Sequence, residues 1–206
     1  MKLVFDVAGV LLHWDPLAML MRLLPEHASD RAAAADWSQR LFEGWAGDWR
    51  EFDRGVLHEP ELVPRIAART GLAPQRVQAV VEAIPHELQP LQGTVALVRR
   101  LKEAGQPVFY LSNMPASYSR LLEQRHDFFA WFDDGVFSGR VQAVKPEPAI
   151  FALAAQRFGL PPQEMVFFDD VQANVDAARE MGWNALLFTS AAQAEADLRQ
   201  RGWWPL

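Results

Sequence analysis

The chain has 206 residues, of which half are hydrophobic and 22% are charged, and its formal net charge is −6. This length suffices for one α/β domain with a sizeable insertion. The acidic balance and the lack of basic runs exclude a nucleic-acid-binding surface. The absence of cysteine excludes disulfides, thiolate catalysis and cysteine-ligated metals. Apolar runs are too short for a membrane span, and the N-terminal residues lack signal-peptide features, so we expect a cytoplasmic protein.

The first predicted element is an apolar strand over Leu3–Val7, which carries Asp6 near its end and runs into a turn at Gly9. Ligands of parallel α/β sheets bind at the carboxyl ends of the strands. A carboxylate at this position is therefore a candidate for ligand binding or chemistry.

The segment from Asp15 to Leu88 contains no predicted strand and is expected to be a helical insertion of about four helices. Asp15 and Pro16 supply an N-cap and a first helical residue. The predicted helices cover Leu17–Leu24, Asp30–Phe42, a segment from Glu59 to Gly71, and a segment from Pro74 to Ile84. The stretch from Gly44 to Arg50, with two tryptophans and two glycines, is predicted to be a loop between helices.

After the insertion, predicted helices and strands alternate. The helices end at glycines and cover Thr94–Ala104, Pro148–Phe158 and Asn174–Met181. The strands are nearly all apolar, as in sheets buried on both faces, and cover Val108–Ser112, Gly135–Phe137, Val166–Phe168 and Ala185–Phe188. This alternation predicts an α/β fold with a doubly wound parallel sheet.

Polar side chains follow the predicted strand ends. Ser112 and Asn113 end one strand, and Asp169 and Asp170 end another. Two adjacent carboxylates repel each other unless a cation lies between them or one is protonated, and oxygen-only ligation suits Mg²⁺. Lys145 lies in a proline-stiffened loop, and its ammonium group could offset the charge of a bound phosphoryl group.

In order and spacing, Asp6, Ser112, Lys145 and the Asp169-Asp170 pair resemble the four motifs of the haloacid dehalogenase-like (HAD) hydrolase superfamily. The resemblance implies that Asp6 is the nucleophile and forms an aspartyl-phosphate. The residues that it implies for phosphoryl binding are Ser112, Asn113 and Lys145. The groups that it implies for holding Mg²⁺ are Asp6, the backbone carbonyl of Ala8, Asp169 and Asp170.

The resemblance covers nearly the whole chain and also implies its organisation. Residues 1–14 and 89–206 are expected to form a Rossmann-like core domain, and residues 15–88 a helical cap domain. The segment Gly9–Pro16 is further similar to a bacterial subgroup that includes the glucose-1-phosphatases. These similarities imply a Mg²⁺-dependent phosphomonoesterase whose partner is a small phosphorylated metabolite, with a sugar phosphate favoured.

One position departs from the pattern. Most phosphatases of this superfamily carry a second aspartate two residues after the nucleophile, which protonates the leaving group and then activates water; here that residue is Ala8. General acid–base help is worth roughly 10²–10⁴-fold, although a good leaving group such as an anomeric sugar needs it less. The candidate replacements are His13 and Asp15 beyond the first strand, and Asp48, Glu51, Asp53 and His58 in the cap.

Two cap residues are candidates for specificity. Trp45 offers an aromatic face to a sugar, and Arg50 could meet a second anionic group. Two other functions stay open. A dehalogenase-type hydrolase needs no leaving-group acid, although the paired carboxylates speak against it. A catalytically weakened protein would bind phosphorylated metabolites and Mg²⁺ without turnover.

Overall fold

The computed structural model describes residues 1–204, without the side chain of Trp45. Its core is a parallel sheet of five strands in the order β5-β4-β1-β6-β7. The strands are β1 (Lys2–Phe5), β4 (Val108–Ser112), β5 (Asp134–Phe137), β6 (Met165–Asp169) and β7 (Asn184–Leu187). Because β1 pairs with both β4 and β6, the carboxyl ends of these three strands lie side by side. The predicted doubly wound α/β fold is confirmed.

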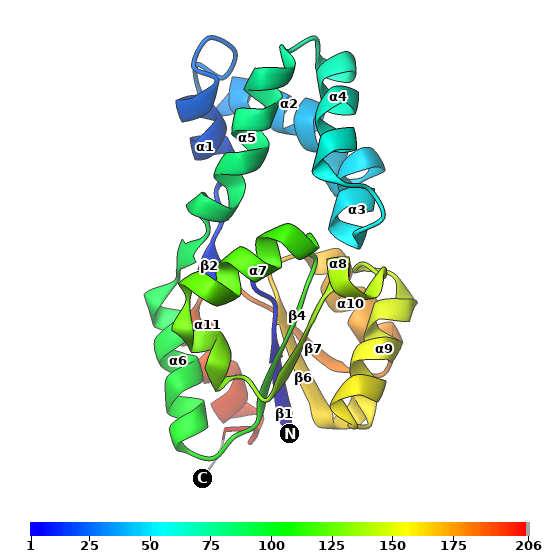
Figure 1. Cartoon of the computed structure of the whole chain (residues 1–206). Helices are drawn as coiled ribbons and strands as arrows, with labels where there is room; N and C mark the ends of the chain where they lie inside the picture. Colours follow the sequence, from blue (N-terminus) through cyan, green and yellow to red (C-terminus); the bar gives the residue numbers. More distant parts are fainter. Residues whose placement is uncertain (205–206) are drawn as a thin grey trace.

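Helices cover both faces of this sheet (Figure 1). Successive strand side chains point to opposite faces, so Leu3 and Phe5 belong to one hydrophobic core and Val4 to the other. The first core is closed by α6 (Gln92–Glu103), α7 (Ala116–Arg125) and α11 (Ala191–Gln200), and the second by α9 (Pro148–Phe158) and α10 (Gln172–Glu180). Shorter helical segments are α8 (Ser138–Val141), η2 (Asp127–Trp131) and η3 (Pro162–Glu164). No helix within residues 1–204 has the length and apolar character that crossing a bilayer would need.

The helical insertion is joined to the core by a short antiparallel ribbon, in which β2 (Leu12–His13) pairs with β3 (Gln89–Pro90). Between these strands lie α1 (Pro16–Leu23), α2 (Arg31–Phe42), η1 (Glu43–Trp45), α3 (Gly47–Arg54), α4 (Glu59–Thr70) and α5 (Pro74–Glu87). Figure 1 shows these helices above the carboxyl ends of the sheet strands. The domain boundaries after residues 14 and 88 remain a prediction.

The expected loop from Gly44 to Arg50 is wrong, because α3 begins at Gly47. The Glu43 carboxylate accepts a hydrogen bond from the Asp48 amide at 3.2 Å and so caps the start of this helix. Trp49 and Phe52 are buried on its inner face, and this packing outweighs the loop preference of the glycines.

The end of α3 rests on the core. The Arg54 guanidinium contacts both oxygens of Glu147, at 2.8 and 2.6 Å. The Asp53 carbonyl accepts a buried hydrogen bond from the Ser138 hydroxyl at 2.6 Å. Gly55 has a φ of +80°, and a Cβ added there would lie 2.4 Å from the Gly139 carbonyl oxygen. The insertion therefore contacts the core through its backbone as well as through an ion pair.

Candidate active site

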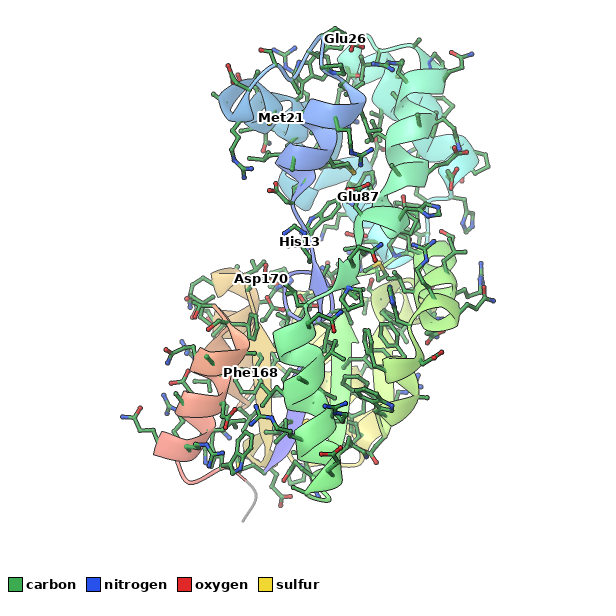
Figure 2. The ribbon with its side chains drawn as sticks, turned by 90° about the vertical axis from the view of Figure 1, so that its left-hand side faces the viewer. His13, Met21, Glu26, Glu87, Phe168 and Asp170 are labelled. Carbon is green, nitrogen blue, oxygen red and sulfur yellow. The ribbon has the colours of Figure 1, made fainter. Side chains whose placement is uncertain are left out.

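A cavity of about 350 Å³ lies between the carboxyl ends of the strands and the insertion. From the core it is lined by Asp6, Ala8, Ser112, Asn113, Lys145 and Asp170, and from α3 by Arg50 and Asp53. Figure 2 shows Asp170 at the edge of the core that faces the insertion. The fold thus brings together side chains from all four predicted motifs. Asp169 does not line the cavity itself but contacts Lys145, which does.

Lys145 is the electrostatic centre of this group. Its ammonium nitrogen lies 2.9 Å from Asp6 Oδ1 and 2.6 Å from Asp169 Oδ2, and all three side chains are buried. Burial alone would lower the pKa of Lys145, but the carboxylates of Asp169 and Asp6 raise it above its ordinary value. The lysine therefore stays charged in this pocket.

Negative charge exceeds positive charge around this lysine. Burial, reinforced by Asp169 and Asp170 and opposed by Lys145, raises the pKa of Asp6 to about 7. Burial and then Asp169 also raise the pKa of Asp170. Carboxylate oxygens of Asp6, Asp169 and Asp170 lie within 4.8 Å of one another. This oxygen-only donor set fits a divalent cation, which would relieve the repulsion among the carboxylates.

The two adjacent aspartates have different surroundings. Asp169 Oδ2 binds Lys145, and its carboxylate also accepts hydrogen bonds from the Asn174 amide at 3.0 Å and from the Val171 backbone N–H at 2.8 Å. Asp170 is more exposed and borders the cavity. We therefore propose that Asp169 mainly holds Lys145 in place. Asp6, Asp170 and the Ala8 carbonyl remain as the proposed metal ligands.

Ser112 and Asn113 are adjacent but have different hydrogen-bonding environments. The Ser112 hydroxyl oxygen is buried without a hydrogen-bond partner, a costly state that a phosphoryl oxygen would relieve. The Asn113 side chain instead forms two hydrogen bonds with the backbone of Lys145, donating at 2.9 Å and accepting at 2.7 Å. The Asn113 amide thus positions the loop that carries Lys145, and because Asn113 also lines the cavity, its expected role in phosphate binding stays a prediction.

Replacing Asn113 with alanine is expected to lower the free energy of unfolding by about 1–3 kcal/mol, because two hydrogen bonds are lost. It should also lower kcat/KM, since the Lys145 loop loses its anchor. Asn184→Ala is the matched control, because this amide also makes two hydrogen bonds with the backbone, donating to two carbonyls at 2.9 and 3.2 Å, but does not line the cavity. Urea unfolding and steady-state kinetics separate the two variants; equal kcat/KM values would contradict the positioning role.

Several candidates from the sequence lie elsewhere. His13 is exposed on β2, where the insertion joins the core (Figure 2). It borders a second cavity, of about 400 Å³, which shares Asp170 with the first. Asp15 caps α1 by accepting from the Ala18 amide at 3.0 Å and pairs with Arg31 at 3.1 Å, and these contacts lower its pKa. Neither residue lines the cavity around Asp6, so the structure does not place them beside the proposed nucleophile, and their acid–base role stays a prediction.

Most of the candidates in the insertion make contacts away from the cavity. Asp48 pairs with two arginines of α4, Glu51 with Arg54, and the exposed His58 precedes α4 as its N-cap residue. The side chain of Trp45 lies outside the described part of the chain. Arg50 lines the cavity but pairs with Glu147 at 3.1 Å, so it also helps to hold α3 on the core.

The sequence named one contributor without singling it out and missed two others. Asp53 was one of four cap candidates for the acid–base role, and its place depends on how α3 packs. Asn174 supports Asp169 from the first turn of α10, five residues further along the chain, a spacing that could have indicated it. Glu147 lies two residues after Lys145, and its two arginine partners in α3 gave no local signal.

Comparisons with known proteins agree with this geometry. Residues 3–182 match a family model described as haloacid dehalogenase-like hydrolase. The chain is 24% identical over 198 residues to the sesquiterpene phosphatase astK of Aspergillus oryzae, covering 96% of this chain and 94% of that protein. It is 24% identical over 185 residues to the fructose-1-phosphate phosphatase YqaB of Escherichia coli, covering 89% and 94%.

A solved structure has a similar fold. It is a HAD family enzyme from Bacteroides thetaiotaomicron in complex with magnesium and inorganic phosphate. The TM-score is 0.70 at 20% identity, and the alignment covers 92% of this chain and 94% of that one.

Proposed function

This chain belongs to the haloacid dehalogenase-like hydrolase family, and we propose that it is a Mg²⁺-dependent phosphomonoesterase acting on a small phosphorylated metabolite. One observation carries the proposal: a buried carboxylate and ammonium pair, Asp6 and Lys145, borders the same cavity as the unpartnered hydroxyl of Ser112. A tetrahedral anion in this cavity would supply Ser112 with its missing partner. The phosphatase names of two relatives support the same reaction class.

The proposed reaction begins at Asp6. Its Oδ1 is engaged by the Val7 amide at 2.7 Å and by Lys145 at 2.9 Å, so Oδ2 is the oxygen available to attack phosphorus. The bond between phosphorus and the alcohol oxygen breaks, and water later cleaves the aspartyl-phosphate. Lys145 and Ser112 offset and bind the charge on the phosphoryl oxygens.

The metal would be held by Asp6, Asp170 and the Ala8 carbonyl. When bound, Mg²⁺ would neutralise phosphoryl charge and reduce repulsion among the carboxylates. The carboxylate cluster, rather than any one residue, supports this proposal. It also favours a phosphatase over a dehalogenase-type hydrolase, because the latter has no use for a cation.

The walls of the cavity beyond the phosphoryl site are largely apolar. They include Trp14, Trp49, Ile84, Leu88 and Met114. Such walls favour an alcohol with an apolar face, either a sugar ring stacked on an aromatic side chain or a terpenoid chain. We propose sugar phosphates as the preferred substrates. Because one relative is a sesquiterpene phosphatase, prenyl phosphates are the second class to test.

Phosphate release from a panel of sugar and prenyl phosphates, with Mg²⁺ or with EDTA, tests the proposal. We expect turnover with Mg²⁺, at least about 10²-fold less with EDTA, and recovery when excess Mg²⁺ is restored. Halide release from 2-haloacids is measured in parallel. A dehalogenase would release halide, with or without EDTA, and would release no phosphate from the panel. No phosphate release from any member, with thermal protection by phosphate and Mg²⁺ retained, would instead favour a binding protein.

A further inference from the structure

The loop after β1 cannot supply a proton to the leaving alcohol. Ala8 borders the cavity, but its methyl group does not exchange protons. An alkoxide without a proton donor is a poor leaving group, because the phosphoryl-transfer transition state places charge on this oxygen. If the enzyme cleaves ordinary alkyl phosphates, another group that lines the cavity must carry the proton.

Most titratable side chains along this cavity already have another role. Asp6 and Asp170 are the proposed nucleophile and metal ligand, and Lys145 is held between two carboxylates. The Tyr118 hydroxyl donates to the Val81 carbonyl at 2.7 Å, and burial raises its pKa well above the ordinary value. The Arg50 guanidinium pairs with Glu147 at 3.1 Å.

Asp53 is the remaining acidic side chain on the insertion side of the cavity. It lies in the last turn of α3, is only 8% exposed and lines the same cavity as Asp6 and Lys145. Its position is fixed at two points, by the hydrogen bond from Ser138 to its own carbonyl and by the bidentate contact of Arg54 with Glu147. The backbone of Asp53 is therefore anchored to the core, and its carboxyl group lines the cavity from the insertion side.

The surroundings of Asp53 favour its protonated form. Burial raises its pKa to about 8, with Lys145 opposing the shift and Asp6 adding to it. A carboxyl group that is neutral near pH 7 can donate a proton, and then accept one from water when the alcohol has left.

We propose that Asp53, from the insertion, is the general acid and base that replaces the function absent at Ala8; this rests on the proposed phosphatase activity. In the first step, the bond between phosphorus and the alcohol oxygen breaks as Asp6 Oδ2 bonds to phosphorus, and the Asp53 proton passes to that oxygen. In the second step, water bonds to phosphorus, the bond to Asp6 breaks, and a water proton returns to Asp53. Each cycle restores both carboxyl groups.

The proposal is tested with Asp53→Asn and two phosphate monoesters that differ in leaving group. For an alkyl phosphate, kcat/KM is expected to fall by about 10²–10⁴-fold, because the alkoxide leaves unprotonated. For 4-nitrophenyl phosphate, whose phenolate leaves without help, rapid mixing should show a burst of nitrophenolate at nearly the wild-type rate. Slow turnover with accumulated phosphoenzyme should follow, because the base for the second step is missing.

Asp48→Asn is the matched control, since it makes the same change on the same helix at a carboxylate that pairs with Arg65 and Arg69. Its kcat/KM should stay within about twofold of wild type for both esters, as for most surface changes. Asp53→Ala provides a second test, because added formate should restore part of its activity on the alkyl phosphate.

The outcomes separate the two proposals. An inactive wild type would overturn the phosphatase function itself and the role of Asp53 with it. An active wild type whose Asp53→Asn variant loses the alkyl phosphate and the nitrophenyl burst equally would keep the phosphatase and overturn the acid–base role. An Asp53→Asn variant with unchanged rates on both esters would overturn that role as well.

Discussion

Replacing Asp6 with asparagine is expected to reduce phosphate release by at least about 10⁴-fold, as for other catalytic nucleophiles. An amide oxygen is a far weaker nucleophile than a carboxylate, and no aspartyl-phosphate can form. The amide can still accept the hydrogen bonds that Val7 and Lys145 now donate to Oδ1. We therefore expect the variant to fold normally, and steady-state kinetics with the best substrate of the panel is the measurement.

The control for the Asp6→Asn variant is its ability to bind phosphate and Mg²⁺. Inorganic phosphate with Mg²⁺ should still raise the melting temperature of Asp6→Asn, because Ser112, Lys145 and Asp170 are intact. Loss of turnover together with retained protection would identify Asp6 as the reacting group. Turnover close to wild type would contradict the covalent mechanism, and a change in affinity alone, in a chain without turnover, would support a binding protein.

Replacing Lys145 with methionine is expected to lower the free energy of unfolding by about 3–5 kcal/mol, because removal of one partner leaves buried charge uncompensated. Asp6 and Asp169 both lose the ammonium group that lies 2.9 and 2.6 Å from them. Activity should also fall, by about 10²-fold or more, since the phosphoryl charge is no longer offset. Urea unfolding and phosphate release measure the two effects.

The matched control is Lys102→Met, which removes a surface lysine that lies 2.8 Å from Asp133. Exposed pairs of this kind contribute about 0–1 kcal/mol. Adding Asp169→Asn to Lys145→Met should recover part of the lost stability, because one uncompensated carboxylate is removed. Equal unfolding free energies for Lys145→Met and Lys102→Met would contradict the structural role of the buried lysine.

Much of the core follows from local patterns in the sequence. Buried strands such as Val108–Ser112 are continuous apolar runs, and helix ends such as that of Pro148–Phe158 are fixed by a following glycine. The first predicted strand, by contrast, extended to Val7, whereas β1 ends at Phe5. There the backbone leaves the sheet, and the Val7 carbonyl accepts the amides of the turn that follows.

The candidate site was only partly accessible to the same reasoning. Side chains that follow strand ends meet because parallel strands bring their carboxyl ends to one edge, so Asp6, Ser112 and Asp170 could be grouped in advance. The roles of Asn113 and Asp53 depend on contacts between segments far apart in the chain. No local sequence pattern predicts how α3 of the insertion packs on the core.

The meeting of Gly55 with the Gly139 carbonyl has a consequence for substrate range. The insertion and the core approach so closely here that no side chain fits at residue 55, and neither glycine is among the residues that line the cavity. A methyl group at residue 55 would clash with the Gly139 carbonyl, and we expect the end of α3, with Asp53, to shift away from the core and leave room for a bulkier alcohol. Substrate range in this chain would thus depend on a position that does not line the cavity.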